Sequence, residues 1–275
     1  LIRQTGTSRG VEVLFAAPVG ANVWEVLSYP GRRIRPGDSV IFGDGEVEGV
    51  FGDTRGQGLR LLKLHGSTTV EDFLDRHGQI PLPPYIQREE GPADEADYQT
   101  VYARAPGAIA APTAGLHFTD PMLQDLAARG IEILKITLHV GIGTFIPVRT
   151  EDPGKHVLKP ERYDLTEETA VRLNAARDAG RRIVAVGTTT TRTLEFVVAR
   201  HSRFEPGSGE ADLFILPGHK FQAVGAMLTN FHLPRSTLLM LVSAFASRET
   251  ILKAYRQAVE QRYRFYSYGD CMLIL

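Results

Sequence analysis

The sequence predicts an α/β protein in which a small antiparallel β-barrel or sandwich precedes a layered α/β domain. Residues 11–65 hold short apolar or alternating runs between Gly- and Pro-rich turns, which is the spacing of a small all-β unit. Later residues alternate helix and strand signals, the pattern of an α/β layer fold. With 275 residues, 43% of them hydrophobic, the chain is long enough to bury the cores of two domains.

Strands are expected throughout the first part of the chain. They are VEVLFAA, NVWEVLS, DSVIF, EVEGVF and LRLLKL, and a short helix over residues 70–77 and the extended segment PLPPYI follow them. We place the domain boundary near Gly66, which gives a β-barrel domain over residues 1–66 and an α/β domain over residues 67–275. The chain opens on Leu1 in what reads as the middle of a strand, so we expect a preceding segment to be missing.

The second part should alternate helices and strands. Helices are predicted over residues 119–129, 166–179, 188–200, 236–246 and 249–263, and strands over residues 131–140, 181–187 and 223–228. Thr119 or Asp120 should cap the first of these helices and Ser236 the fourth. The fourth helix is apolar on every side, so we expect it to be buried all round. The last helix is expected to turn four side chains inward: Ile251, Leu252, Tyr255 and Val259.

Charge and cysteine content exclude several classes of protein. The 31 basic and 32 acidic residues give a formal net charge of −1, so no global field would attract nucleic acid. The single cysteine, Cys271, excludes an internal disulfide and a cysteine-cluster metal site, and it fits a cytoplasmic protein. The sequence shows no histidine spacing typical of a metal site, so we expect no metal. The apolar helix is shorter than the ~18 residues of a membrane span, so no membrane association is expected.

Four polar clusters fall at the ends of predicted strands or helices, where open α/β sheets place their ligands. They are APTAGLHFT (residues 111–119), LHVGIGTF (138–145), VGTTTTRTLE (186–195) and the stretch TNFHLPRST (229–237). The GxG that begins at Gly141 lacks the third glycine of a dinucleotide fingerprint, so a tight turn is the better interpretation. VGTTTTRT lacks the lysine of a P-loop, and its threonines can simply cap a helix.

Histidines and one arginine in these clusters are the first candidates for chemistry. His117, His139 and His232 each lie beside a glycine or a helix start, where a functional and a structural role are both open. The helix that begins near Ser236 offers unpaired N–H groups, and Arg235 adds a full charge. This helix start therefore predicts an anion site, with Asn230 and His232 beside it.

The tail YRFYSYGD, residues 263–270, interleaves aromatic residues with arginines. Aromatic faces and guanidinium groups can stack on unpaired bases. A strand with its aromatic residues packed inside and its arginines in water is the other interpretation, and periodicity alone favours it.

Seven longer motifs together resemble one family. PLPPYI, YQTVYA, APTAGLHFT, TLHVGIGTF, VGTTTTRTLE, TNFHLPRSTLLMLVSAFA and YRFYSYGDCML stand in the order of the S-adenosylmethionine:tRNA ribosyltransferase-isomerases of queuosine biosynthesis. The resemblance runs from about Val11 to the C-terminus, and it implies an α/β domain with an inserted small β-barrel. The chain departs from the family's HxMHxE pattern at HVLKPE, where Lys159 replaces the second histidine, and we assign that loop no role.

The resemblance implies a transferase and isomerase that acts on tRNA. It would move the ribosyl group of S-adenosylmethionine onto the 7-aminomethyl-7-deazaguanine at the wobble position and rearrange it, giving epoxyqueuosine-tRNA, adenine and methionine. S-adenosylmethionine is then a cosubstrate, and no cofactor is bound permanently. The implied partner is a tRNA with a GUN anticodon, and a monomer is expected. Because the sulfonium acidifies the adjacent C5′ hydrogens, a positioned base can open the ribose ring and expel adenine.

The resemblance also implies roles for particular residues. The base should have a pKa near the working pH, which makes His117, His139 and His232 the first candidates, with Asp270 behind them. The remaining candidates are expected to bind substrate. Arg192, Arg235 and the helix start at Ser236 suit the methionine carboxylate or tRNA phosphates; Thr113, Gly115, Gly141, Thr144, Thr229 and Asn230 suit ribose hydroxyls and purine edges; Phe118 and Tyr266 suit stacking.

Three alternatives remain open from the sequence. The basic turn at Arg32, Arg33 and Arg35 is either a grip on the tRNA backbone or an ordinary solvated turn. The chain could instead be a methyltransferase with the same cosubstrate, which would release S-adenosylhomocysteine. It could also be a non-catalytic RNA-binding module built from the β-barrel and the aromatic tail.

Overall fold

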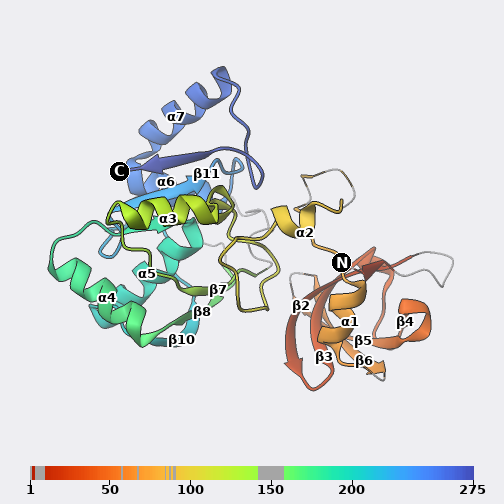
Figure 1. Ribbon diagram of the computed structural model, residues 1–275. Coiled ribbons are helices and arrows are strands. Elements are labelled where there is room, and N and C mark those ends of the chain that lie inside the picture. Colours follow the sequence, from red (N-terminus) through yellow and green to blue (C-terminus); the bar gives the residue numbers. More distant parts are fainter. Residues whose placement is uncertain are drawn as a thin grey trace. The chain divides into compact units, whose positions relative to one another are not determined.

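The computed structural model describes residues 2–3, 10–56, 58–66, 68–83, 85–86, 88, 91–141 and 158–275. The chain divides into two compact units, Leu1–Glu95 and Ala96–Leu275. Both units combine helices with strands, so the predicted mixed α/β class is confirmed (Figure 1).

One six-stranded antiparallel sheet forms the first unit. In spatial order its strands are β1 (Ile2–Arg3), β2 (Glu12–Gly20), β3 (Val23–Tyr29), β6 (Leu59–Gly66), β5 (Val47–Gly56) and β4 (Ser39–Phe42). The five predicted strands are confirmed as β2 to β6. Within the described residues the predicted barrel is wrong, because β1 and β4 are short edge strands that do not pair with each other, so the sheet stays open.

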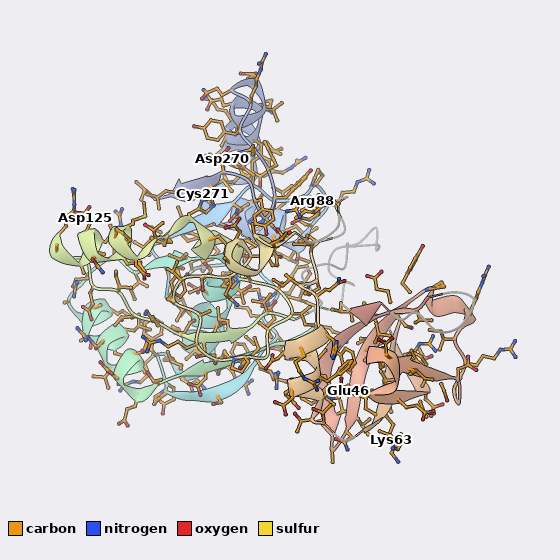
Figure 2. The ribbon with its side chains drawn as sticks, turned by 45° about the vertical axis from the view of Figure 1, so that its right-hand side comes forward. Glu46, Lys63, Arg88, Asp125, Asp270 and Cys271 are labelled. Carbon is orange, nitrogen blue, oxygen red and sulfur yellow. The ribbon has the colours of Figure 1, made fainter. Side chains whose placement is uncertain are left out.

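Helix α1 (Val70–His77) covers part of this sheet, as the sequence predicts. Its Phe73 is 1% exposed and packs into the core that the strands build with Val13, Val26 and Leu62. Thr69 caps the helix by accepting a hydrogen bond from the Asp72 N–H. Near its end Arg76 pairs with Glu46, which lies in the loop between β4 and β5 (Figure 2).

One arginine stabilises the turn between β3 and β4 through hydrogen bonds to its backbone. The turn contains the 3-10 turn η1 (Gly31–Arg33), whereas a second 3-10 turn, η2 (Gly43–Gly45), follows β4. Arg60, 8% exposed, donates hydrogen bonds of 2.9 Å to Gly31 O and to Ile34 O. Arg33 and Arg35 remain exposed on this turn.

The second unit holds most of the helices. They are α3 (Asp120–Ala128), α4 (Glu167–Asp178), α5 (Thr188–His201), α6 (Thr237–Ala246) and α7 (Arg248–Glu260), with the 3-10 turn η3 (Thr113–His117); α2 (Asp94–Asp97) spans the boundary between the units. The predicted helices are confirmed. Thr119 and Ser236 cap α3 and α6 by accepting the Met122 and Leu239 N–H groups, as expected.

Two three-stranded sheets lie in this unit. In the first, β8 (Glu161–Leu165) pairs antiparallel with β7 (Thr137–His139) and β10 (Gly207–Ala211). In the second, β11 (Ala226–Asn230) lies between the parallel β9 (Val184–Val186) and the antiparallel β12 (Cys271–Ile274). The strand predicted over residues 131–140 is therefore only three residues long.

The predicted strand in the aromatic tail is wrong. Residues 261–270 form turns, and β12 begins only at Cys271. Arg262 and Tyr266 have φ values of 59° and 74°, in the left-handed region that no strand tolerates. The turn is so tight at Gly269 that a Cβ there would lie 2.4 Å from the Phe265 carbonyl carbon.

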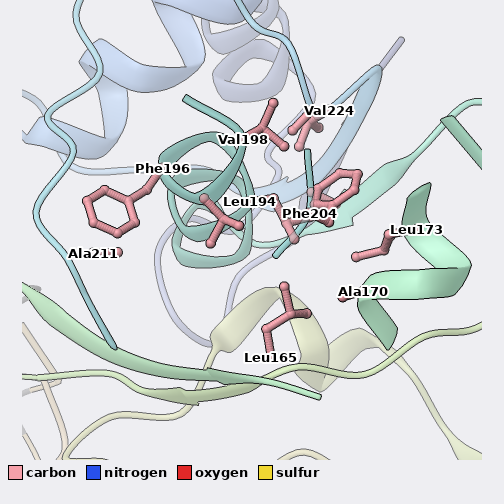
Figure 3. Packing of buried hydrophobic residues seen from close by; sticks show 12 residues of the cluster. Leu165, Ala170, Leu173, Leu194, Phe196, Val198, Phe204, Ala211 and Val224 are labelled. Atoms are coloured by element: carbon pink, nitrogen blue, oxygen red, sulfur yellow. The ribbon is translucent and has the colours of Figure 1, made fainter. Parts of the chain in front are cut away.

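Helix α5 is the centre of the main core. Leu194, Phe196 and Val198 of α5 gather with Leu173 of α4 and Leu165 of β8 (Figure 3). A second cluster joins β11 to α6 and α7 through Met227, Leu241 and Ile251, among others. The core therefore fixes α5 and β11, the two elements from which the candidate site is built.

Helices α6 and α7 are less buried than the sequence predicts. Only Leu241, Val242 and Ser243 of α6 are fully buried, and Val259 of α7 is 64% exposed. Helix α6 packs against β11 and α7, and its Phe245 also packs against the core around α5, yet its other apolar side chains stay partly exposed. No helix in the described part of the chain is long and apolar enough to cross a membrane.

Candidate functional site

The carboxyl end of β11 is the centre of the candidate site. Thr229 and Asn230 are 1% and 2% exposed. The Thr229 hydroxyl lies 2.9 Å from His232 Nε2. Asn230 Nδ2 donates to Tyr266 O at 3.0 Å and to Ser267 O at 3.4 Å. The buried strand end thus holds both the His232 segment and the aromatic tail.

The turn η3 packs against β11 and carries His117. The Tyr102 side chain approaches Gly115 closely: a Cβ on Gly115 would lie 2.1 Å from the Tyr102 hydroxyl, so no other residue fits without a shift. His117 is half-buried, and its Nε2 is buried with no hydrogen-bond partner among the described residues. The Asp270 carboxylate is close enough for its charge to act on the imidazole.

Asp270 closes the aromatic tail on itself immediately before β12 (Figure 2). One of its carboxylate oxygens accepts the Arg264 N–H at 2.7 Å, and its own N–H donates to Arg264 O at 2.8 Å. The next residue, Cys271, is the cross-strand partner of Asn230. A negative charge is therefore fixed beside the end of β11.

The three candidate imidazoles differ in their electrostatics. Burial lowers the pKa of His232 to about 4, so this imidazole is neutral at neutral pH. Burial also lowers the pKa of His139, and the positive charge of Arg162 lowers it further, against a weaker opposite effect of Asp164. For His117, burial lowers the pKa while the Asp270 carboxylate opposes that shift. Only His117 has a carboxylate as its dominant charged neighbour.

His139 lies in a separate group around β8. It is the last residue of β7 and stands opposite Arg162 in the sheet. A Cβ on Gly107, which has a φ of 121°, would lie 2.9 Å from its Nδ1, and that nitrogen is buried without a partner in the described residues. Val140 O, next along the chain, accepts the Ile109 N–H at 2.9 Å.

Arg192 belongs to this second group and is already paired. It is 5% exposed in α5 and forms a buried ion pair with Glu161, also 5% exposed, at the start of β8. The charge of Arg192 is thereby compensated within the protein. Its Nε is buried without a partner in the part of the chain that the structure describes.

Glu195, one turn further along α5, links that helix to β11. Its buried carboxylate accepts the N–H groups of Gln222, Ala223 and Val224 at 2.9–3.2 Å. These residues lead directly into β11. Hence α5 and the strand that carries Thr229 and Asn230 form one frame.

The structure brings most of the predicted site residues together. The group around the end of β11 comprises Thr113, Gly115, His117, Thr229, Asn230, His232, Tyr266 and Asp270, with Phe118 directly after η3. His139 and Arg192 lie in the group around β8, and Gly141 follows β7. The start of α5 joins the groups, because a Cβ on Gly187 would lie 3.8 Å from Ala114 of η3.

The remaining predicted residues are more loosely placed. Arg235 is exposed with a φ of 57°, and Ser236 serves as the cap of α6 while its hydroxyl also donates to Leu233 O at 2.7 Å. The start of α6 therefore follows His232 closely in sequence but presents its arginine to solvent. Thr144 lies outside the described residues.

Several residues of the site carried no recognisable signal in the sequence. Glu161 closes the HVLKPE stretch to which no role is assigned, and Glu195 stands in VGTTTTRTLE without a predicted partner. Tyr255, expected only as a core residue, accepts the His232 N–H at 2.7 Å, and burial raises its pKa to about 12. In the described ranges, no group of three or more His, Cys, Asp or Glu side chains could hold a metal ion.

Comparisons with known proteins agree with one another. The family model described as "Queuosine biosynthesis protein" matches residues 1–274. Proteins called S-adenosylmethionine:tRNA ribosyltransferase-isomerase from Symbiobacterium thermophilum and Moorella thermoacetica are each 51% identical, over 98% and 99% of this chain and 78% and 79% of theirs. The crystal structure of S-adenosylmethionine tRNA ribosyltransferase from Thermotoga maritima is 35% identical, with a TM-score of 0.50, over 97% of this chain and 75% of that one.

Proposed function

Because the chain belongs to the queuosine biosynthesis protein family, we infer that it is an S-adenosylmethionine:tRNA ribosyltransferase-isomerase. It transfers the ribosyl group of S-adenosylmethionine to 7-aminomethyl-7-deazaguanine at the wobble position of tRNA and isomerises it, giving epoxyqueuosine-tRNA, adenine and methionine. The observation that carries this function is the 51% identity to curated enzymes of that name over nearly the whole chain.

His117 is the general base of this proposal. The sulfonium of S-adenosylmethionine acidifies the adjacent C5′ hydrogens, and their removal opens the ribose ring and expels adenine. Proton transfer is most efficient when the pKa of the base lies near the working pH. Asp270 opposes the loss of basicity that burial causes at His117 and stabilises the imidazolium once it forms, whereas His232 is too weak a base.

The other two candidate histidines, His232 and His139, bind substrate and do not remove the proton. His232 is oriented by the Thr229 hydroxyl on its ring and by Tyr255 on its backbone, so it can present a fixed ring to the ribose. His139 stands beside Arg162, and their position next to Gly107 suits contact with a polar part of either substrate.

Anion binding falls to two helix starts. The exposed Arg235 precedes α6, and its charge adds to the positive end of the helix, which suits a tRNA phosphate. The start of α5 has no side-chain cap and lies beside η3, which suits the methionine carboxylate. Arg192 has a structural role at the start of α5, because its charge is compensated by Glu161 inside the protein.

Recognition of tRNA relies on its unpaired anticodon loop. Phe118 after η3 and Tyr266 in the tail provide ring faces for the wobble base of a GUN anticodon. All the catalytic and binding candidates belong to a layered α/β domain after Gly66, and the sheet before it acts as an accessory domain. The enzyme acts as a monomer in the cytoplasm and uses S-adenosylmethionine as a cosubstrate without a bound cofactor.

Product analysis tests this function directly. The protein is incubated with S-adenosylmethionine and a tRNA that carries 7-aminomethyl-7-deazaguanine, and the small molecules are separated. Ribosyl transfer yields one adenine and one methionine for each modified tRNA. Release of S-adenosylhomocysteine would establish a methyltransferase instead, and tRNA binding without any turnover would establish a non-catalytic RNA-binding module.

A further inference from the structure

Two buried asparagines in the second unit are satisfied to different degrees. Asn174 of α4 uses both ends of its amide: Nδ2 donates to Phe204 O at 2.8 Å, and Oδ1 accepts the Phe204 N–H at 3.0 Å. Asn230 uses only one end, since Nδ2 donates to Tyr266 O and Ser267 O while Oδ1 has no partner among the described residues.

The orientation of the Asn230 amide is fixed by its partners. Two backbone carbonyls face Nδ2, and only the NH₂ end of an amide can donate to both of them. Oδ1 is then the end of the amide that faces away from these two carbonyls. Asn230 is 2% exposed, and a buried acceptor without a partner costs about 1–3 kcal/mol, so its retention calls for a ligand that supplies a donor.

The surroundings of Oδ1 select the kind of donor. Asp270 lies one residue from Cys271, the cross-strand partner of Asn230, and brings a negative charge. The acceptors here are thus the unpartnered amide oxygen of Asn230 and a carboxylate that uses one of its two oxygens for the Arg264 N–H. A cationic N–H donor satisfies both, whereas the hydroxyls of ribose and the amine of adenine are neutral.

We propose that Asn230 Oδ1 and the Asp270 carboxylate together bind the aminomethyl group of the wobble base. This inference rests on the proposed function, whose substrates bring two cationic N–H donors: the aminomethyl group and the α-ammonium of S-adenosylmethionine. The α-ammonium belongs to the methionine part, whose carboxylate we place at the start of α5, which leaves the aminomethyl group for Asn230 and Asp270. Asn230 and Asp270 thereby determine specificity: they place the amine beside His117 and reject a tRNA whose wobble base lacks it. The tail closed by Asp270 and Arg264 forms one wall of this amine site.

Binding measurements with two tRNAs test the proposal. One tRNA carries 7-aminomethyl-7-deazaguanine at the wobble position, and the other, of the same sequence, carries guanine. The unsubstituted protein should bind the first about tenfold or more tightly, the value of one charge-assisted hydrogen bond. Asn230→Ala should reduce this preference to below about threefold. Asp270→Asn, which keeps an oxygen for the Arg264 N–H but removes the charge, should do the same.

Asn174→Ala is the matched control, because it removes a buried asparagine whose hydrogen bonds are all internal. It should lower the melting temperature and leave the preference for the amine intact. An unchanged preference in folded Asp270→Asn and Asn230→Ala would overturn the proposal. So would a tenfold loss of S-adenosylmethionine affinity with the preference retained, since Oδ1 would then face the cosubstrate. When one of these two outcomes is found and the unsubstituted protein still releases adenine, only the proposed amine site is wrong. When the unsubstituted protein releases no adenine, the proposed function itself is wrong.

Discussion

The Thr229 hydroxyl lies 2.9 Å from His232 Nε2, at the point where β11 ends. Together with the bond from the His232 N–H to the Tyr255 hydroxyl, this contact fixes the ring and the backbone of His232. A histidine that is half-buried, neutral and held on both sides orients a substrate well but accepts a proton poorly. We therefore expect His232 to orient a substrate and His117 to act as the base.

Replacing the three histidines one at a time should give unequal losses. His117→Ala should lower kcat about 100-fold or more, the usual contribution of a general base. His139→Ala and His232→Ala should act mainly on KM. The measurement is adenine release at saturating and limiting S-adenosylmethionine, with melting temperatures to verify folding. Near-normal rates in all three variants would show that no histidine is the base.

Acid should destabilise the protein through His232. Its pKa lies at about 4 in the folded state against 6.5 in the unfolded chain, so the unfolded chain binds more protons between these values. The contribution of His232 to the free energy of unfolding is fully present above pH 6.5. It falls as the pH drops toward 4, by up to about 1.4 kcal/mol per pH unit. His117 and His139 act in the same direction. Urea unfolding at several pH values should show this slope, and His232→Gln should flatten it; an equal slope in the variant would contradict the assignment.

Glu195 should be among the most important residues for stability. Glu195→Ala leaves the N–H groups of Ala223 and Val224 buried without an acceptor and removes the acceptor of the Gln222 N–H, so we expect the free energy of unfolding to fall by about 3 kcal/mol or more. Glu210→Ala on β10 is the control, because its side chain is exposed and its loss should change stability by less than about 0.5 kcal/mol. Similar midpoints of urea unfolding for the two variants would refute this role.

Arg235→Ala should weaken the binding of an anion. If Arg235 contacts a tRNA phosphate, the variant should bind tRNA more weakly, and the slope of log K against log salt should become shallower by about 0.7–0.9. Arg129→Ala serves as the control, since Arg129 is exposed but engaged with Asp125. A loss confined to S-adenosylmethionine affinity would assign Arg235 to the methionine carboxylate. Unchanged affinity for both ligands would remove the anion site at α6.

The fold was predictable wherever local patterns decide it. Alternating apolar residues between turns located β2 to β6, and the caps Thr119 and Ser236 marked the starts of α3 and α6. The tail was not predictable, because its aromatic alternation imitates a strand while the left-handed Tyr266 and the tight turn at Gly269 exclude one. Burial of α6 was overestimated, because composition does not reveal how many sides of a helix meet a neighbour.

The sequence predicted which loops carry the candidate site residues, but not which side chains pair with each other. Polar clusters at strand ends indicated His117, Thr229 and Asn230, because such ends meet at sheet edges. The pairing of Arg192 with Glu161 joins residues 31 apart in the sequence, and nothing local to either residue announces it. Which end of the Asn230 amide is occupied likewise depends on the tail turn, 36 and 37 residues away.

The Glu195 carboxylate, which accepts three consecutive backbone N–H groups, affects ligand binding through rigidity. Since Glu195 couples α5 to the segment that leads into β11, the two elements that carry the candidate site are held in place before any ligand binds. Little ordering entropy then remains to be lost from this scaffold on association, and adaptation to two large substrates is left to the side chains and loops above it.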